Sequence, residues 1–429
     1  MSEEAFTSAS RKGEKMKKLL ALLLAVLMCL SLAACSSGNG GGEQAPAETP
    51  AEEPAPAETE AAAETFDELL AAGIANGNKL TIYSTHSVTV TALEAFMKKY
   101  APEIEYEGTQ IGDTNQVTQV AQEVKEGVKG ADIIFIQDGA RVLTDLVDEG
   151  YVYNWYNQEI KDLVGDDCEP LLVWDYCNKV VMYNNGADNT YNEGDITNLW
   201  FATDPANKGA FWMKDPTTEG VNMNFLVNLT SDENAAKLEA AYKEYYGKDL
   251  VLDEDCPNAG YQFIKMLYQN EMMLGSSDST IAKDIAAAEK PQSGLLTLNK
   301  YLKSRGTRED GTTFNLLYAK DELKPTAGFI YPIYGLQVAN ADNPELAKAF
   351  LIWLYSEEGW YGDGEMTIAD GSVYKGMQGR YGDYSGNTAN PVADGDMSVV
   401  EWKKILVQED PVQAAEYRAD VEDFIQLIK

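Results

Sequence analysis

The sequence predicts an α/β protein whose globular part is divided into two lobes. Short apolar segments typical of β-strands alternate with segments whose apolar residues recur every three or four positions, the spacing of an amphipathic helix. Such alternation is typical of a parallel sheet with helices on both faces. The alternating part is about 360 residues long, and a single hydrophobic core rarely exceeds about 250–300 residues. We therefore expect two lobes.

The individual elements follow from these patterns. Predicted strands cover residues 80–83, 104–106, 131–136, 179–183, 210–213, 294–298 and 336–339. Helical spacing is clearest at Leu346, Phe350 and Trp353, and it also marks residues 142–147. Ligands of such sheets bind beyond the carboxyl ends of the strands. The loops that follow the strands are therefore candidate binding loops.

The N-terminus has the features of an export signal. A basic segment at residues 16–18 precedes an apolar stretch over residues 19–34, about 16 residues, whereas a spanning helix needs about 20. This order is typical of a signal peptide, with an uncleaved anchor as the alternative. Its end, Leu-Ala-Ala-Cys at residues 32–35, resembles a bacterial lipoprotein signal. That resemblance implies a signal over residues 1–35 and lipidation of Cys35 at the outer face of the cytoplasmic membrane.

Residues 36–65 contain mainly Gly, Ser, Ala, Pro and Glu. This composition buries too little apolar surface to offset the entropy of ordering, so we expect a disordered tether.

Charge and composition exclude several classes of function. A net charge of −35 is unsuited to tracking nucleic-acid phosphates. The chain has one histidine, His86, so Ser-His-Asp or Cys-His chemistry could be centred only there. No Walker motif is present, and we expect no cofactor. Outside the signal region, Cys168, Cys177 and Cys256 allow one disulfide and one free thiol, or three reduced thiols.

Four ordered segments carry a resemblance to a known family. They are residues 80–86, 130–151, 195–217 and 343–359, the last beginning Asn-Pro-Glu-Leu-Ala-Lys-Ala-Phe and ending Ser-Glu-Glu-Gly. They resemble the bacterial extracellular solute-binding proteins of the two-lobed type that includes ferric-ion, thiamine, polyamine and phosphonate binders. The similarity runs from about Lys79 to Gly359.

The resemblance implies a type II periplasmic-binding-protein-like fold with a hinge of strand crossovers, near Lys179–Asn184 and near Phe329–Ala339. The implied organisation is lobe 1 over 66–180, lobe 2 over 181–328, a return to lobe 1 over 329–358, and a C-terminal helical segment over 359–429. It also implies a monomeric receptor without catalysis, which closes around a solute and delivers it to the permease and ATPase subunits of an ABC importer.

Polar residues after the strands and on the return crossover are candidate ligand contacts. They are Ser84, Thr85, His86, Asp113, Thr114, Asn115, Gln137, Asp138, Arg141, Thr217, Thr218, Ser276, Ser277, Asp278, Ser279, Thr280, Lys300, Tyr301, Tyr331 and Tyr334. Asp113 or Thr114 could instead cap a helix, and the two crossover tyrosines could pack in the core. In ferric-ion members a His directly after the first strand is a metal ligand, and His86 has this position. Those members also carry adjacent tyrosines where this chain has at most Tyr301.

We expect the ligand to be a small oxygen-rich solute, either anionic or polyhydroxylated. Lys300 favours an anion, and the hydroxyls of residues 276–280 with nearby free amides favour oxygen ligands. A ferric or chelated metal ion bound through His86 is the next alternative, and a polyamine the third. A lipid-anchored hydrolase and a ligand-sensing module are the rival classes of function.

Overall fold

The computed structural model describes residues 64–429 except 186–189, 301–305, 308–312 and 321–322. The predicted signal peptide with Cys35, nearly all of the predicted tether, and Tyr301 lie outside the described residues. Within the described part of the chain, no helix is both long and apolar enough to cross a membrane.

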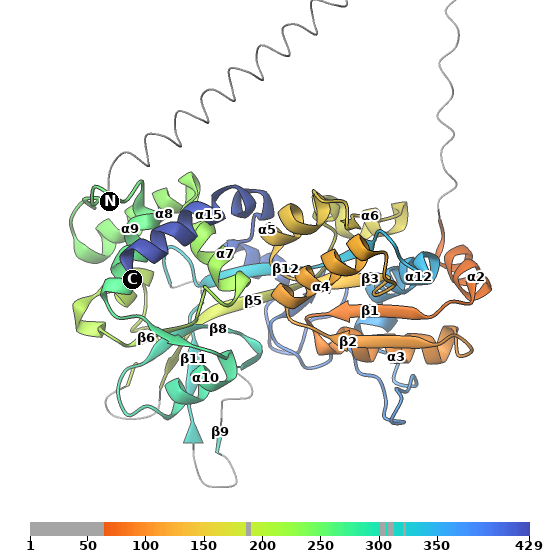
Figure 1. The fold of residues 1–429 in the computed structure, drawn as a ribbon. Coiled ribbons are helices and arrows are strands. Elements are labelled where there is room, and N and C mark those ends of the chain that lie inside the picture. Colours follow the sequence, from red (N-terminus) through yellow and green to blue (C-terminus); the bar gives the residue numbers. More distant parts are fainter. Residues whose placement is uncertain (1–63, 186–189, 301–305, 308–312, 321–322) are drawn as a thin grey trace, which may run out of the picture. The chain divides into compact units, whose positions relative to one another are not determined.

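One sheet of twelve strands runs through the molecule, with the order β2-β1-β3-β12-β5-β8-β6-β7 along its main path (Figure 1). We name lobe 1 the half that contains the parallel strands β1 (Leu80–Ser84), β2 (Tyr106–Gln110) and β3 (Ile133–Ile136). Lobe 2 contains the parallel strands β6 (Phe211–Lys214), β7 (Met273–Gly275) and β8 (Ser293–Thr297). The α/β class and the two-lobed fold are thus confirmed.

Two long antiparallel strands, β5 (Val173–Asn184) and β12 (Gly328–Val338), join the lobes. Residues 179–183 of β5 pair with β8 of lobe 2, and residues 334–337 of β12 pair with β3 of lobe 1. The predicted hinge of strand crossovers is therefore present. Both strands begin earlier in the sequence than predicted, because their first residues gain pairing partners that lie far away in the chain.

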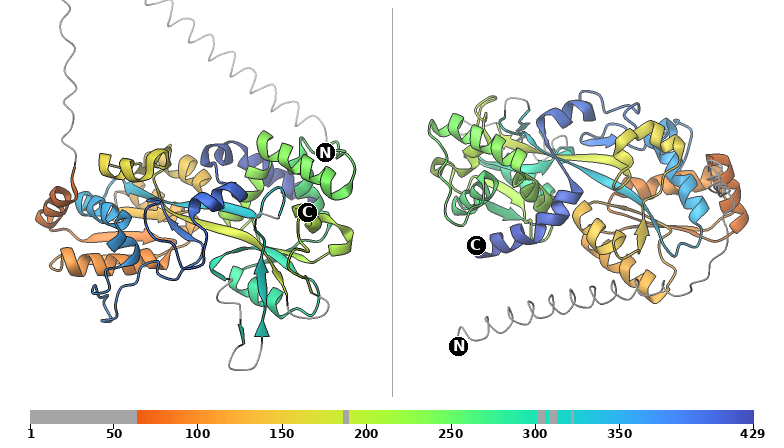
Figure 2. Two further views of the ribbon diagram at one scale, coloured as in Figure 1. Left: turned by 180° about the vertical axis from the view of Figure 1, so that it is seen from behind. Right: turned by 90° about the horizontal axis from the view of Figure 1, so that it is seen from above.

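Helices cover both faces of the sheet (Figure 2). The main ones are α2 (Phe66–Asn76), α3 (Ser87–Tyr100), α4 (Asp113–Glu126), α6 (Gln158–Val164), α7 (Gly220–Leu229), α8 (Asp232–Tyr246), α9 (Ala259–Gln269), α10 (Asp278–Ala287), α12 (Pro344–Tyr355), α13 (Glu357–Tyr361), α14 (Val399–Ile405) and α15 (Pro411–Ile428). Short elements are β4 (Val152–Tyr153), η2 (Gly165–Cys168), η3 (Leu199–Thr203), η4 (Pro205–Asn207), β9 (Gly306–Thr307), β10 (Thr313–Phe314) and β11 (Leu316–Tyr318).

Each lobe has its own aromatic packing. In lobe 1 the rings of Phe96 and Phe350 lie 5.3 Å apart. In lobe 2 the Trp200 ring lies 4.9 Å from Tyr242 and 5.1 Å from Phe263. Burial of each such side chain contributes about 1.5–3 kcal/mol, so each lobe has a core that holds its strand ends in place.

The Asn-Pro-Glu motif at residue 343 has a direct structural role. Asn343 caps α12 by accepting a hydrogen bond from the Leu346 N–H at 3.3 Å, and Pro344 occupies the first turn, where it is well tolerated. The Asn343 amide also donates to the carbonyls of Gly73 and Asn78, at 3.1 and 2.8 Å. This one residue therefore begins α12 and fixes α2 against it.

Two predicted elements differ from the structure. Residues 142–147 form η1 (Val142–Val147), a π-helical stretch preceded by the short helix α5 (Gly139–Arg141), rather than a regular helix. The segment 359–429, which was expected to be helical, contains α14 and α15 but also β13 (Asp383–Ser385) and β14 (Val407–Gln408). These strands are only three and two residues long, and they exist because they pair with β5 and β12.

The C-terminal helix α15 contacts both lobes. It lies against α5 and η1 of lobe 1 and against α7 and α9 of lobe 2, where Phe424 packs at 5.1 Å on the ring of Tyr261 (Figure 1).

Candidate ligand site

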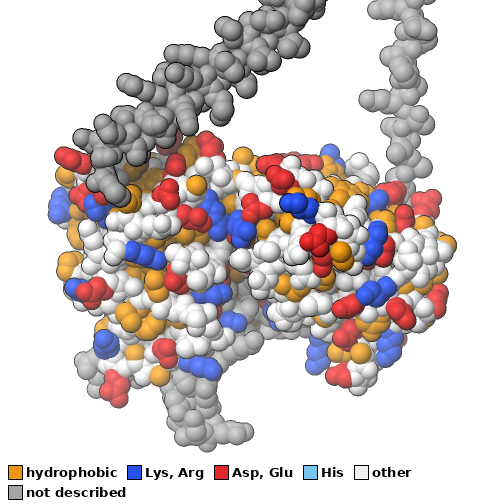
Figure 3. Space-filling model, in the orientation of Figure 1, with side chains coloured by type: hydrophobic (Ala, Val, Ile, Leu, Met, Phe, Trp, Pro, Cys, Tyr) orange, Lys and Arg blue, Asp and Glu red, His pale blue; other side chains and the backbone are white. Residues whose placement is uncertain are grey.

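The segments that follow β2 and β3 of lobe 1 and β6 of lobe 2 meet at a common groove. The groove has a volume of about 490 Å³, and its lining includes Thr114 and Arg141 of lobe 1, Thr217, Thr218 and Glu219 of lobe 2, and Arg418 of α15. Lysine and arginine side chains gather at the junction of the lobes on the face shown in Figure 3. The groove is therefore polar and receives residues from three parts of the chain.

A row of polar side chains lies on one face of the hinge strand β5. Asp175, Cys177 and Lys179 are 0%, 7% and 1% exposed, and their spacing of two places them on the same face of the strand. Tyr331 of β12 is paired with Cys177 across the hinge and is also buried. The hinge thus brings two charged groups to the boundary between the lobes.

On the lobe 1 side, His86 lies between two carboxylates of the hinge region. Its Nδ1 is 3.4 Å from Asp175 Oδ2, and its Nε2 is 3.4 Å from Asp383 Oδ1. Arg380 completes the cluster, with Nη2 at 2.6 Å from His86 Nε2 and Nε at 3.0 Å from Asp383 Oδ2. A guanidinium is only a donor, so His86 Nε2 must accept this hydrogen bond.

Burial governs the protonation of this cluster. It raises the pKa of Asp175 to about 7, although the neighbouring His86 acts in the opposite direction. It also raises the pKa of the Cys177 thiol well above its usual value, and the charges of Asp175 and Asp383 add to that effect. Cys177 is therefore a protonated thiol.

On the lobe 2 side, Lys179 is surrounded by oxygen acceptors. Its Nζ lies 2.7 Å from Glu219 Oε2, 2.8 Å from Asn222 Oδ1 and 3.5 Å from Asp278 Oδ2. Lys214 bonds the other oxygen of Glu219 at 3.0 Å. Asp278 Oδ1 is buried and has no hydrogen-bond partner among the described residues.

The two carboxylates of this cluster differ because their partners differ. Burial acts to raise the pKa of Glu219, but Lys179 and Lys214 together lower it below its usual value. Burial raises the pKa of Asp278, although Lys179, with its Nζ 3.5 Å from Asp278 Oδ2, acts in the opposite direction. For Lys179, burial acts to lower the pKa, yet Asp278 and Glu219 raise it overall. Asp278 is thus the carboxylate that is left with a free acceptor.

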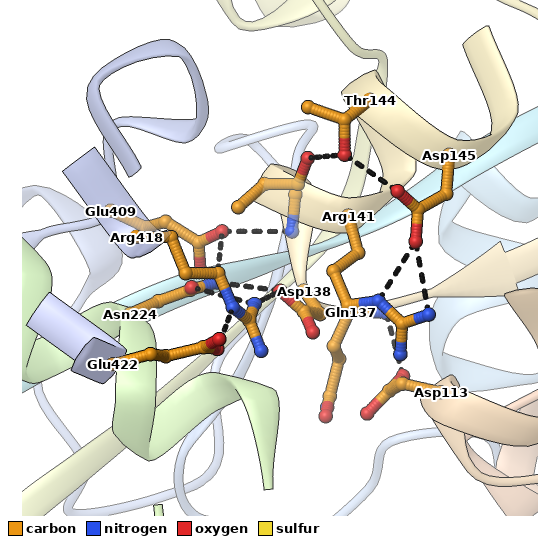
Figure 4. Close-up of polar contacts among 12 residues, drawn as sticks. Asp113, Gln137, Asp138, Arg141, Thr144, Asp145, Asn224, Glu409, Arg418 and Glu422 are labelled. Atoms are coloured by element: carbon orange, nitrogen blue, oxygen red, sulfur yellow. Dashed lines mark hydrogen bonds and ion pairs between the residues drawn. The ribbon is translucent and has the colours of Figure 1, made fainter. Parts of the chain in front are cut away.

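A third polar cluster joins lobe 1, lobe 2 and α15 (Figure 4). Asp138, directly after β3, accepts hydrogen bonds at Oδ1 from Asn224 of α7, at 3.1 Å, and from Arg418 of α15. Glu409 Oε1 accepts from the Gly139 N–H at 3.0 Å and from the Asn224 amide at 3.3 Å. Burial, with the charge of Asp138 adding to it, raises the pKa of Glu409 to about 8.

The contact between Asp138 and lobe 2 depends on a glycine. A Cβ on Gly220, the first residue of α7, would lie 2.0 Å from Asp138 Oδ2, so no larger residue fits there without movement. Asp138 itself has a φ of 60°, a left-handed conformation that aspartate tolerates better than most residues.

Comparisons with known proteins bear on the fold. No protein-family model and no curated protein matches the sequence. Iron-bound HitA from Pseudomonas aeruginosa is 15% identical, with 82% of this chain and 99% of that chain covered and a TM-score of 0.57. The substrate binding protein of the ABC transporter from Agrobacterium tumefaciens is 14% identical, with 82% and 95% covered and a TM-score of 0.53.

A third similar structure is the periplasmic binding protein AfuA from Actinobacillus pleuropneumoniae, with exogenous fructose-6-phosphate bound. It is 17% identical, with 82% of this chain and 97% of that chain covered and a TM-score of 0.51. This chain has a two-lobed periplasmic-binding-protein fold. The structural similarity covers 82% of this chain, which is more than the segment from about Lys79 to Gly359 that carries the sequence resemblance.

Several predicted contact residues of this binding-protein fold lie at the boundary between the lobes. The structure brings together His86 with the hinge, Asp138 with lobe 2, Asp278 with Lys179, and Arg141 with Thr217 and Thr218 across the groove.

Other predicted contacts have local roles. Ser84 Oγ donates to the His86 carbonyl, and Ser277 caps α10. Asp113 does not cap α4, whose N-cap is Gly112; its Oδ1 accepts from the Gln137 N–H at 3.0 Å instead. Burial raises the pKa of Asp113 to about 7.

The remaining predicted residues divide by exposure. Thr114, Asn115, Ser276, Ser279 and Thr280 are exposed, and Lys300 is half-buried. The hydroxyls of Thr85 and Tyr334 are buried and make no hydrogen bond within the described chain, and Tyr331 packs face to face with Phe329, their ring centroids 5.9 Å apart. The predicted alternative of core packing therefore describes both crossover tyrosines.

Several residues of the site are not among those predicted from the sequence. Asp175 and Lys179 alternate with apolar residues inside a buried strand, and that pattern was visible in the sequence. Arg380 and Arg418 had no local signal, because they reach the site from the C-terminal segment, 294 and 280 positions away from their partners. The three cysteines, Cys168, Cys177 and Cys256, are free and buried, so the alternative of three reduced thiols describes the structure.

Proposed function

We propose that this protein is a receptor that captures a small solute between its two lobes and delivers it to an ABC importer. The observation that carries the proposal is the meeting of charged residues from lobe 1, lobe 2, the hinge strand β5 and the C-terminal segment at one boundary. Closure of two rigid lobes about a hinge is a known way to bury a polar ligand. The fold shared with solved binding proteins supports this assignment.

The ligand that fits this boundary best is a small oxygen-rich solute, anionic or polyhydroxylated. The free acceptor of Asp278 suits a ligand hydroxyl, whereas the arginine and threonine side chains of the groove suit ligand oxygens. AfuA, which shares the fold, was solved with fructose-6-phosphate, a solute of this class.

A ferric or chelated metal ion is the second candidate. One observation favours it: His86, Asp175 and Asp383 offer ligand atoms that all lie within 4.8 Å of one another. HitA, also of this fold, was solved with iron.

We further propose that the protein acts without catalysis, as a monomer. Residues 1–35 would be its signal, and Cys35 would tether it to the outer face of the cytoplasmic membrane through residues 36–65. Lobe 1 would comprise 66–180 and 329–358, and lobe 2 would comprise 181–328.

Thermal denaturation of the mature chain with a panel of solutes tests the receptor function. The panel contains sugars, phosphate esters, phosphonates, polyamines and Fe(III). A ligand at a hundredfold excess over its Kd stabilises the native state by about 2.7 kcal/mol, so we expect a rise in Tm of several degrees with one class.

Two variants localise the binding site. Arg141→Ala removes an arginine of the groove and should reduce the shift, whereas Lys129→Ala removes an exposed lysine paired with Asp342 and should leave it unchanged. A panel in which no solute raises Tm would contradict the receptor function.

A further inference from the structure

The cluster around His86 has the donor set of a metal site. One imidazole nitrogen and two carboxylates, from Asp175 and Asp383, lie within 4.8 Å of one another. Such mixed nitrogen and oxygen ligands suit zinc and iron. Both carboxylates are almost completely buried, at 0% and 1% exposure of their side chains.

A positively charged side chain already occupies this cluster. Arg380 donates from Nη2 to His86 Nε2 at 2.6 Å and from Nε to Asp383 Oδ2 at 3.0 Å. A metal ion on Nε2 would lie about 2.1 Å from that nitrogen and would need the same lone pair. Arg380 and a metal ion therefore exclude each other at His86 Nε2.

The second nitrogen of His86 does not offer an alternative ligand. When Nε2 accepts a hydrogen bond, the proton of a neutral imidazole is on Nδ1, which then has no lone pair for a metal. Nδ1 lies 3.4 Å from Asp175 Oδ2, the same distance that separates Nε2 from Asp383 Oδ1, so the position of the proton follows from the Arg380 hydrogen bond to Nε2.

The fold also holds Arg380 in this position. Its N–H bonds the Met377 carbonyl at 3.1 Å, and its partner Asp383 is the first residue of β13, which pairs with the hinge strand β5. A buried carboxylate that loses its ion-pair partner is left as an uncompensated charge, which is strongly unfavourable. Arg380 is thus the counter-charge of the buried Asp383 carboxylate.

We propose that Arg380 determines the class of the ligand by keeping metal ions away from His86, so that the cargo is not a metal ion held by this histidine. The inference rests on the proposed function of solute capture, and it decides between the two ligand classes given there. Replacement of Arg380 by an uncharged side chain converts the cluster into a metal site.

The test is a calorimetric titration of metal-free protein with Zn²⁺. Arg380→Met should bind one Zn²⁺ at least tenfold more tightly than the parent chain, and the double variant Arg380→Met/His86→Ala should lose this gain. Lys99→Met is the matched control, because Lys99 also pairs with carboxylates, Glu358 at 2.7 Å and Asp363 at 3.1 Å, but contacts no imidazole and lies outside the groove. It should bind Zn²⁺ like the parent.

Two results overturn the proposal. One is a folded Arg380→Met variant that gains no affinity for Zn²⁺. The other is a parent chain that binds Zn²⁺ or Fe(III) nitrilotriacetate and loses at least tenfold in affinity through His86→Ala. This second comparison needs no change at Arg380, so it decides the matter even where Arg380→Met does not fold.

The outcome is separate from that of the solute panel. If no solute raises the Tm of the parent chain, solute capture fails while the role of Arg380 still stands or falls by the Zn²⁺ titration. If a solute binds and His86 also holds a metal in the parent chain, only the role assigned to Arg380 fails.

Discussion

Lys179 is a buried cation whose charge is balanced by side chains of lobe 2. Its side chain is 1% exposed, and its ammonium group lies close to Glu219, Asn222 and Asp278. Glu219 directly precedes α7, and Asp278 is the first residue of α10. One side chain of the hinge therefore positions two loops of lobe 2.

We expect Lys179→Met to lower the free energy of unfolding by about 3–5 kcal/mol, because it leaves two buried carboxylates with one fewer cation. Urea denaturation measures this loss. Lys79→Met is the matched control: Lys79 bonds Glu107 at the same 2.7 Å, but the two side chains are 44% and 57% exposed. That change should cost at most about 1 kcal/mol, and equal losses in the two variants would contradict the importance of burial.

At the scale of elements, α15 connects the lobes through buried charges rather than through apolar contact alone. Arg418 bonds Asp138 of lobe 1, reaches Asn224 of lobe 2 at 3.2 Å and bonds Glu422 of its own helix at 2.7 Å. The helix therefore ties the first loop beyond β3 to α7. The position of the lobes depends on the end of the chain as well as on the two hinge strands.

Replacement of Arg418 by Met should release this connection. The side chain of Asp138 is 2% exposed and, among the described residues, would keep only its hydrogen bond from Asn224, so we expect a loss of about 3 kcal/mol in stability. Hydrogen exchange of the α15 amides should become faster. Lys237→Met, which removes an exposed pair with Glu233 in α8, should change neither quantity. Unchanged protection of α15 in Arg418→Met would show that apolar packing alone holds the helix.

At the scale of the whole molecule, buried carboxylates make stability depend on pH. The pKa of Asp175 is raised to about 7, and that of Glu409 to about 8. Between their usual values near 4 and these raised values, the native state binds more protons than the unfolded state. These groups add to the free energy of unfolding below about pH 4. Their contribution is lost as the pH rises to about 7 or 8.

Asp175→Asn tests this dependence, because Asn keeps an oxygen that can accept the 3.1 Å hydrogen bond from the Tyr384 N–H. The variant should gain stability relative to the parent as the pH rises from 4 to 7, by at most about 1.4 kcal/mol per pH unit. Denaturant midpoints measured across this range provide the comparison. A difference between variant and parent that does not change with pH would contradict the raised pKa.

The sequence predicted most of the fold, since strand and helix spacing are local properties. The alternation of strands and helices was predictable in this way, and the length of the chain indicated two lobes. The crossovers near residues 179 and 329 were implied by the family resemblance instead. The two-residue strand β14 was not, because its pairing with β12 depends on residues about 80 positions away. Local spacing has no information about such a partner.

The site was only partly predictable for the same reason. His86 and Asp138 follow strands, and general rules for α/β sheets led to them. Arg380 contacts His86, and Arg418 contacts Asp138. Both arginines belong to a segment that was expected only to be helical. Which charged residue lies beside a buried one depends on their proximity in space. A single sequence does not reveal that proximity.

His86 is the one histidine of the chain, and it lies at the boundary between the lobes. A histidine-selective NMR spectrum of the untagged protein should therefore contain a single imidazole signal set, which needs no assignment. Its two ring nitrogens face different parts of the molecule, Asp175 on one side and Arg380 with Asp383 on the other. The NMR signals of His86 can therefore report on occupancy of the site by a ligand, on metal binding and on the tautomer of the imidazole.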